Sequence, residues 1–150
     1  PSLKAHVHDK AIMNIVTSGN SVHTSLEVPS HNVFGFEHTP NNDKQKTVVK
    51  DKLKLLRETA AKFIVFKDDF CKPEKTVVES SIESIGAKSK QAHSDVDIKV
   101  HYKCKRAVDD QTIKVETLKY LNLKQLRLNI LSDKFTPAVT ITDKSHSVKV

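Results

Sequence analysis

The chain has 150 residues, of which 37% are hydrophobic and only 5% aromatic, with a net charge of +7. This length suits one domain (1–150) with an aliphatic core, and no apolar run reaches the roughly 20 residues of a membrane-spanning helix. The positive charge is typical of nucleic-acid-binding modules. We favour this alternative less, because the lysines are not interleaved with aromatic residues and arginines are few.

The first part of the chain predicts a β-hairpin. Residues 3–17 largely alternate apolar and polar side chains, which predicts a half-buried strand with a bulge near Asp9. Residues 18–20 (Ser-Gly-Asn) are a turn signal. Residues 21–28 alternate again, so this second segment is expected to pair with the first.

The next part predicts a loop followed by one long helix. Residues 30–41 are interpreted as an irregular loop, after which Asn41 or Asn42 caps a helix over residues 43–64. Apolar residues step along one face of this helix at spacings of three and four. They are Val49, Leu53, Leu56, Ala60 and Phe63.

The remaining segments are mostly strands. The predicted elements are a strand at 74–85, a strongly alternating strand at 94–104, an ambiguous helix or strand at 112–121, a strand at 125–131 and a hairpin over 137–150 turning at Asp143-Lys144. Short strands with one long helix predict an α+β fold. We expect a curved, mainly antiparallel sheet, barrel-like at the extreme, with the helix packed on one side.

Two cysteines, Cys71 and Cys104, are present without a C-x-x-C motif, which excludes a thiolate zinc ribbon and a thioredoxin-type centre. Either they form one disulfide in a secreted domain, or they are two buried thiols in a cytosolic one. We favour the disulfide, because Cys104 shares the inward parity of Val100 and Tyr102 in its strand.

Eight histidines exceed the three or four (roughly) that ordinary composition gives for this length. His6 and His8 lie on the same side of a predicted strand, about 6.5–7 Å apart along it. Both imidazoles can therefore converge on one zinc ion, at about 2.0–2.1 Å each. The alternative is a pair of exposed surface histidines.

Glu37 and His38 lie in a loop between two conformationally special residues. Gly35 permits backbone conformations that other residues resist, and Pro40 stiffens the far side. Such a loop suits a metal site or a catalytic base, or it is a plain connection to the helix. No nucleophile elbow, H-E-x-x-H motif or Gly-rich phosphate loop accompanies it, so the case for catalysis is weak.

His93 precedes the strongly alternating strand, and Asp95 and Asp97 follow at strand spacing. An aspartate can ligate zinc or orient a ligating histidine, although an exposed loop histidine is the simpler interpretation of His93. The other histidines are interpreted as surface or structural residues. They are His23, His31, His101 and His146.

Several motifs share one resemblance. Residues 5–8 (Ala-His-Val-His) are followed by residues 35–40 (Gly-Phe-Glu-His-Thr-Pro), and later by Cys71, His93 and residues 102–104 (Tyr-Lys-Cys). Together these resemble the zinc-regulated periplasmic proteins called ZrgA, a zinc-uptake accessory family. The resemblance covers most of the chain and is most specific over residues 5–40.

The resemblance implies a non-enzymatic, zinc-binding protein of the periplasm, made under zinc limitation and acting with a zinc-import component. The chain starts at Pro1 rather than at Met, so we expect a form from which a signal peptide has been removed. The alternative function is a non-metal adaptor domain of the cell envelope.

The resemblance also implies a ligand set. The metal-binding histidines would be His6, His8 and His38, with His93 as the leading fourth ligand. Glu37 and Asp95 are alternative ligands or supporting residues. Many family members carry a His/Asp-rich insertion where this chain has the short loop 87–93, so a single mononuclear Zn²⁺ site is expected.

Overall fold

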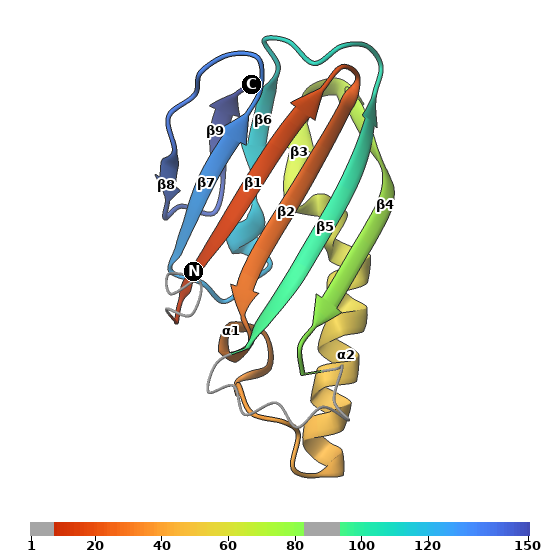
Figure 1. Cartoon of the computed structure of the whole chain (residues 1–150), viewed down its shortest axis with the longest axis vertical. Helices are drawn as coiled ribbons and strands as arrows, with labels where there is room; N and C mark the ends of the chain where they lie inside the picture. The colour runs from red at the N-terminus through yellow and green to blue at the C-terminus, as the bar shows by residue number, and fades with distance from the viewer. Residues whose placement is uncertain (1–7, 83–93) are drawn as a thin grey trace.

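A computed structural model describes residues 8–82 and 94–150 of the chain. The predicted ligands His6 and His93, and the predicted strand segments 3–7 and 83–85, lie outside the described residues. The described chain is α+β, with a mainly antiparallel six-stranded sheet, a three-stranded sheet and one long helix (Figure 1). The large sheet has the order β4-β5-β2-β1-β7-β8, and the small sheet has the order β3-β6-β9.

The segments predicted at 94–104 and 125–131 match observed strands closely, whereas the strand predicted at 74–85 begins earlier, at Cys71, and the short strand Ile64–Phe66 was not predicted. The strands of the large sheet are β1 (Lys10–Ser18), β2 (Ser21–Pro29), β4 (Cys71–Ser80), β5 (Asp95–Cys104), β7 (Gln125–Leu131) and β8 (Val139–Ile141). Those of the small sheet are β3 (Ile64–Phe66), β6 (Thr112–Val115) and β9 (His146–Lys149). The helices are α1 (Ser30–Phe34) and α2 (Asp43–Thr59), with short 3₁₀ turns at Ala60–Lys62, Lys67–Asp69 and Thr117–Lys119.

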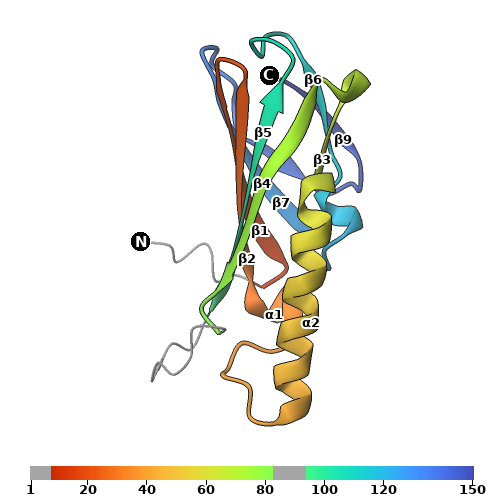
Figure 2. The same cartoon turned by 90° about the vertical axis from the view of Figure 1, so that its right-hand side faces the viewer.

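The helix and the small sheet cover the same face of the large sheet. Figure 2 shows this layer edge-on, with α2 beside the lower half of the large sheet and β3, β6 and β9 beside the upper half. In both views no described helix or strand covers the opposite face of the large sheet, which we call the open face. The core therefore lies between the two layers, and α1 closes its lower end.

Strand alternation explains which side chains enter this core. Ala11, Met13 and Ile15 of β1 are buried, as are the residues of predicted inward parity in β2 and β5. The β1–β2 hairpin is confirmed, with Ser18 opposite Ser21. On its other side β1 pairs with β7 in parallel, which makes the sheet mixed rather than purely antiparallel.

The helix α2 begins where the sequence places a cap. The side chain of Asn42 accepts a hydrogen bond from the Gln45 backbone N–H at 2.9 Å, and the Gln45 side chain accepts one from the Asn41 N–H at 2.7 Å. The predicted apolar face is buried from Val49 to Phe63. The α-helix ends at Thr59 and continues as a 3₁₀ turn, so the predicted end at residue 64 was too late.

Two further predictions need correction, and the barrel-like extreme of the predicted fold is not reached. Residues 30–41 are not wholly irregular, because the five-residue helix α1 follows directly after β2. Residues 137–150 do not form a hairpin: β8 pairs with β7 in the large sheet, whereas β9 pairs with β6 in the small one. The described strands form two open sheets and no closed barrel, since β4 and β8 remain as edges.

A disulfide joins the upper ends of β4 and β5, as predicted. Cys71 and Cys104 are direct cross-strand neighbours and are bonded to each other. Next to them Tyr102 is buried, and its hydroxyl donates a hydrogen bond to the Ala61 carbonyl at 3.0 Å. Burial raises the pKa of this phenol. The disulfide thus links β5 to β4 within the large sheet, and the tyrosine links β5 to the 3₁₀ turn that follows α2.

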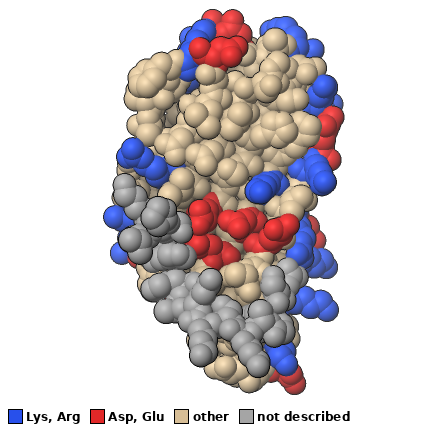
Figure 3. Space-filling view, in the orientation of Figure 1, with Lys and Arg blue, Asp and Glu red and all other residues tan. Residues whose placement is uncertain are grey.

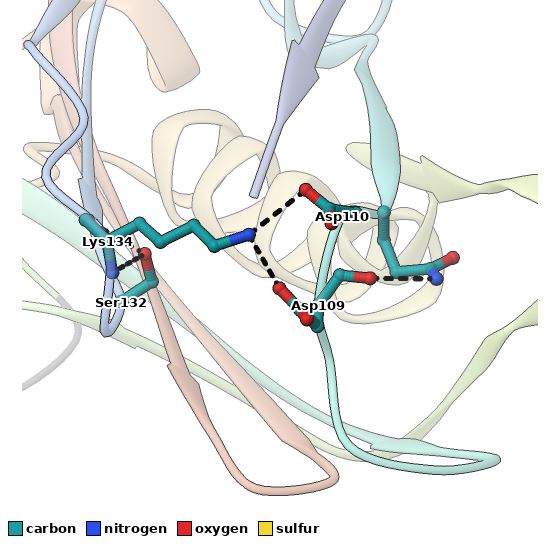
Figure 4. Close-up of polar contacts among 5 residues, drawn as sticks. Asp109, Asp110, Ser132 and Lys134 are labelled. Carbon is teal, nitrogen blue, oxygen red and sulfur yellow. Dashed lines mark hydrogen bonds and ion pairs between the residues drawn. The ribbon is translucent and has the colours of Figure 1, made fainter.

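Two surface loops meet at the same upper end of the molecule. Figure 4 shows Lys134, between β7 and β8, contacting Asp109 at 2.8 Å and Asp110 at 3.0 Å in the loop between β5 and β6. The Ser132 hydroxyl fixes the backbone of Lys134 by donating to its carbonyl and accepting from its N–H. All of these charged groups are exposed, so the network orders the loops without contributing to the core.

Candidate functional site

The candidate site lies at the lower end of the large sheet, where the chain turns out of β2. Pro29 ends β2, and α1 follows for little more than one turn. Gly35 then adopts a left-handed conformation with φ of 88°, and its N–H donates to the His31 carbonyl at 2.9 Å. This turn directs residues 36–38 away from the helix, as Gly35 was predicted to allow.

The Glu37 side chain lies next to the residues that precede β1. Its carboxylate contacts Nε2 of His8 directly. The His8 side chain is 47% exposed and that of Glu37 only 16%, so the contact lies at the boundary between solvent and protein. The imidazole of His8 also stacks on that of His31, with ring centroids 4.5 Å apart and planes at 11°. The structure thus brings His8 and Glu37 together and adds a third side chain.

Residue 9 fixes the position of His8. Asp9 has a left-handed backbone with φ of 68° instead of the predicted bulge within a strand. The buried Asn32 side chain accepts a hydrogen bond from the Asp9 N–H and donates to the Asp9 carboxylate and to the Asn122 carbonyl, each at 2.8 Å. The hydrogen bond from Asn32 lowers the pKa of Asp9. Asn32 therefore joins the entry to β1, helix α1 and the segment before β7.

His38 is held in a tautomer suited to a metal. Its Nδ1 lies 2.8 Å from the Thr39 carbonyl, which can only accept, so Nδ1 carries the proton and Nε2 the lone pair. The ring stacks on Phe36 with centroids 5.1 Å apart. Metal-ligating histidines commonly donate their second ring N–H to a backbone carbonyl in this way. An exposed His38 with Nε2 as acceptor fits a zinc ion.

The segment that follows His93 is anchored to the same loop. The Ser94 hydroxyl is hydrogen-bonded to the Ser30 hydroxyl at 2.6 Å and to the Glu37 carbonyl at 3.1 Å. The Ser94 carbonyl accepts from the Ser30 N–H at 2.9 Å. Residues 8–9, 30–38 and 94–95 therefore meet around α1, although they are far apart in sequence.

Carboxylates surround this meeting point on the open face. Glu27 of β2 and Glu79 of β4 flank Asp97 of β5 in register, and Asp95 lies two residues along β5 on the same face. We call these four residues the acidic band, and Figure 3 shows acidic side chains gathered below the middle of this face. The chain is positively charged overall, so this concentration of negative charge is local.

Crowding changes the titration of the band. Partial burial raises the pKa of Asp95 to about 7, and a hydrogen bond with Glu27 and the charges of Glu27, Asp97 and Glu37 add to the shift. Burial and Glu27 also raise the pKa of Asp97. A bound cation would relieve this repulsion. Asp95, predicted as an alternative ligand, therefore lies among groups that favour a positive ion.

The described residues do not by themselves complete a metal site. Within residues 8–82 and 94–150, no three His, Cys, Asp or Glu side chains are grouped so as to hold a metal ion. Donors of the right chemistry are nevertheless present: the imidazoles of His8 and His38 and the carboxylate of Glu37 are ligand types that zinc accepts. His6 and His93 lie outside the described residues. In the sequence His6 is two residues before His8, and His93 directly precedes Ser94.

Sequence reasoning missed two features of this site. His31 was interpreted as a surface or structural residue, yet its ring stacks on His8. The helix α1 has only five residues, which is too short for a periodic pattern to predict which side chains His31 contacts. The acidic band was foreseeable in part, because Asp95 and Asp97 share the outward parity of their strand, but the placement of Glu27 and Glu79 depends on strand order.

Comparisons with known proteins bear on the whole chain. In the described residues no helix is both long enough and apolar enough to cross a membrane. A search of curated proteins finds no match. A family model described as "ZrgA family zinc uptake protein" matches residues 5–150, which is nearly the entire chain. The chain therefore belongs to the ZrgA family of zinc uptake proteins.

Proposed function

We propose that this protein binds zinc in the periplasm and passes it to a component of a zinc-import system, without enzymatic activity. Zinc is its cargo, held in one mononuclear site by His6, His8 and His38, with His93 as the leading fourth ligand. Family membership supports zinc uptake as the process. The disulfide and the absence of a membrane-spanning helix from the described residues are compatible with a periplasmic protein.

The observation that carries the proposal is the convergence of three segments on α1. The residues next to the predicted ligands are fixed by hydrogen bonds: Asp9, beside His8, to Asn32, and Ser94, beside His93, to Ser30 and Glu37. His38 follows Glu37 in the same loop. The described residues beside the proposed ligands come from three distant parts of the sequence and lie together around α1, which supports one shared ion. The Thr39 carbonyl also favours the tautomer of His38 in which Nε2 carries the lone pair.

The local charge supports a divalent cation as the cargo. The acidic band and Glu37 give this end of the open face a negative potential, which attracts cations and partly offsets the cost of dehydrating the ion. Binding requires neutral imidazoles, so protons compete with zinc as the pH falls through about 6.5, the ordinary histidine pKa.

The test is calorimetric zinc titration of the wild type against His8→Ala and His38→Ala. Each substitution removes a ligand and should weaken the tight site at least tenfold. His146→Ala is the matched control, because His146 lies on β9 of the small sheet with its own carboxylate neighbour, Asp143, at 3.1 Å. If His8→Ala and His38→Ala both bind zinc with unchanged affinity, the ligand assignment is wrong.

Delivery needs a separate test, because a zinc-binding protein need not be a donor. Association with a purified periplasmic component of a zinc importer should require zinc and should be lost in the His8→Ala and His38→Ala variants. Association that is independent of zinc in all variants would instead indicate an adaptor whose histidines are incidental.

A further inference from the structure

A second pair of histidines lies on the open face, away from the candidate site. His23 of β2 and His101 of β5 are direct cross-strand partners. Their rings are stacked almost parallel, with centroids 4.2 Å apart and planes at 4°. Each is four residues from an acidic-band residue on its own strand, Glu27 or Asp97, which corresponds to roughly 13 Å. The proposed zinc site does not include this pair.

The two ring nitrogens of His101 have different surroundings. Its Nδ1 lies 3.4 Å from the Glu74 carboxylate, which favours a proton on Nδ1. Its Nε2 is inaccessible to solvent and has no hydrogen-bond partner among the described residues. A carboxylate beside one ring nitrogen and a lone pair on the other is the usual arrangement of zinc-binding histidines. A buried nitrogen without a partner is rare and needs an explanation.

The two rings line a hollow that can hold an ion with water ligands. The hollow has a volume of about 260 Å³ and is also lined by Val16, Val77 and the lysines Lys75 and Lys99. A water occupies about 30 Å³ in the liquid, so an ion and two or three waters fit. The lysine ammonium groups oppose a dication, so an ion here is bound more weakly than at the candidate site.

We propose that His23 and His101 form a second binding site for a borderline divalent transition metal such as Zn²⁺ or Cu²⁺. Two metal–nitrogen bonds of about 2.0–2.1 Å span up to about 4.2 Å, so both rings can reach one ion after their lone pairs turn toward each other. Glu74 positions His101, and water completes the coordination. Imidazole suits both metals, and Cu²⁺ binds more tightly in general.

The test uses the full chain carrying His8→Ala and His38→Ala, so that the proposed zinc site is disabled. Cu²⁺ and Zn²⁺ are titrated separately by calorimetry, and electron paramagnetic resonance of the Cu²⁺ form counts nitrogen ligands. We expect one remaining ion with two nitrogen ligands. Adding His23→Gln or His101→Gln should weaken binding at least tenfold and remove one nitrogen from the spectrum.

Further variants separate ligation from positioning and from general charge. Glu74→Gln should weaken binding less than the histidine variants and keep both nitrogens, while His146→Gln should change neither readout. The substituted side chains are exposed, except for those of His101 and His146, which are partly buried. Thermal melts check that each variant is folded. In the otherwise wild-type chain, His23→Gln should leave the tight zinc site intact, so the two proposals fail or succeed separately.

Two results would overturn the second site. One is unchanged Cu²⁺ and Zn²⁺ binding when His23→Gln and His101→Gln are added together to the disabled background. The other is binding of inorganic phosphate in the hollow, dependent on Lys75 and Lys99, with no metal bound by the His23 and His101 pair. That outcome would make the hollow an anion site instead.

Discussion

The two ends of β5 are built in different ways. At the upper end Cys104 is covalently bonded to Cys71, its N–H donates to the Asn20 carbonyl, and the neighbouring Tyr102 is buried against Phe66. At the lower end Ser94 and Asp95 are held to α1 by hydrogen bonds and lie beside other carboxylates. The same strand is therefore covalently fixed at one end and polar at the other.

We infer from this difference that the fold is stabilised mainly at one end and that the proposed binding occurs at the other. A covalent and apolar end tolerates changes in solvent and charge, so it can stabilise the fold under varied conditions. A polar end with crowded carboxylates is less stable by itself and can gain stability when a cation arrives. If the two ends are energetically separate, a substitution at one end should leave the properties of the other end unchanged.

The largest effect should come from the upper end. Removing the disulfide with Cys71→Ala and Cys104→Ala, 33 residues apart in sequence, should lower the free energy of unfolding by about 3–4 kcal/mol, because the unfolded chain gains freedom. Urea denaturation measures this, and reduced wild type should behave similarly. Zinc affinity of the folded variant should stay the same; a parallel loss of zinc binding would show that the ends are coupled.

The next largest effect should come from Asn32. In Asn32→Ala the Asp9 N–H and the Asn122 carbonyl lose their buried partner, which should cost about 1–3 kcal/mol of unfolding free energy. Zinc affinity should fall as well, because Asp9 no longer fixes His8. Asn129→Ala is the control, since its amide makes one bond to Asn14 on the open face. Equal effects in both variants would argue against the special role of Asn32.

Asp95 should show a smaller effect of opposite sign. Because the pKa of Asp95 is raised, the folded protein keeps a proton on this carboxyl between about pH 4 and pH 7, whereas the unfolded chain has lost it. The free energy of unfolding therefore falls as the pH rises through that range. Asp95→Asn removes this loss and should stabilise the metal-free protein by about 1 kcal/mol at pH 8, since solvent screens the exposed part of the carboxyl. Below about pH 4 the difference should vanish.

Urea denaturation at pH 4, 6 and 8 measures this pH dependence. Asp133→Asn, which changes an exposed carboxyl outside the acidic band, should show no such trend. If Asp95→Asn were instead less stable than the wild type at pH 8, the ionised Asp95 carboxylate would stabilise the fold, contrary to this prediction.

The smallest effect should come from the surface of the upper end. Lys134→Ala breaks the contacts with Asp109 and Asp110, but these groups are exposed and the contacts are screened. We expect the melting temperature to change by less than about 2 °C. A larger drop would show that loop contacts, in addition to the disulfide, stabilise this end.

The strands that sequence could predict are those whose alternation reports a core face. Residues 94–104 and 125–131 match β5 and β7 closely, because Val96, Ile98 and Val100 face the core while their neighbours face solvent. Residues 143–144 lie in a bend between β8 and β9, but these two strands join different sheets, so the predicted hairpin does not form. Local turn chemistry cannot specify which sheet a strand enters.

The candidate site was predictable in composition and not in arrangement. Motifs identified His8, Glu37 and His38, and the structure brings the first two into contact. The stacking of His31 on His8 and the anchoring of Ser94 to Ser30 depend on how α1 packs beneath the sheet. These contacts join residues many positions apart, and no spacing in the sequence encodes them.

The parallel pairing of β1 with β7 has a consequence for how the protein is made. Asn14 of β1 pairs with Asn129 of β7, 115 residues later in the chain, so this parallel pair cannot form until β7 has been synthesised. At about 5–20 residues per second, that interval lasts on the order of ten seconds. Distant pairings also slow folding itself. During this interval β1 is present without one of its two sheet neighbours, so its unpaired edge is exposed to other chains.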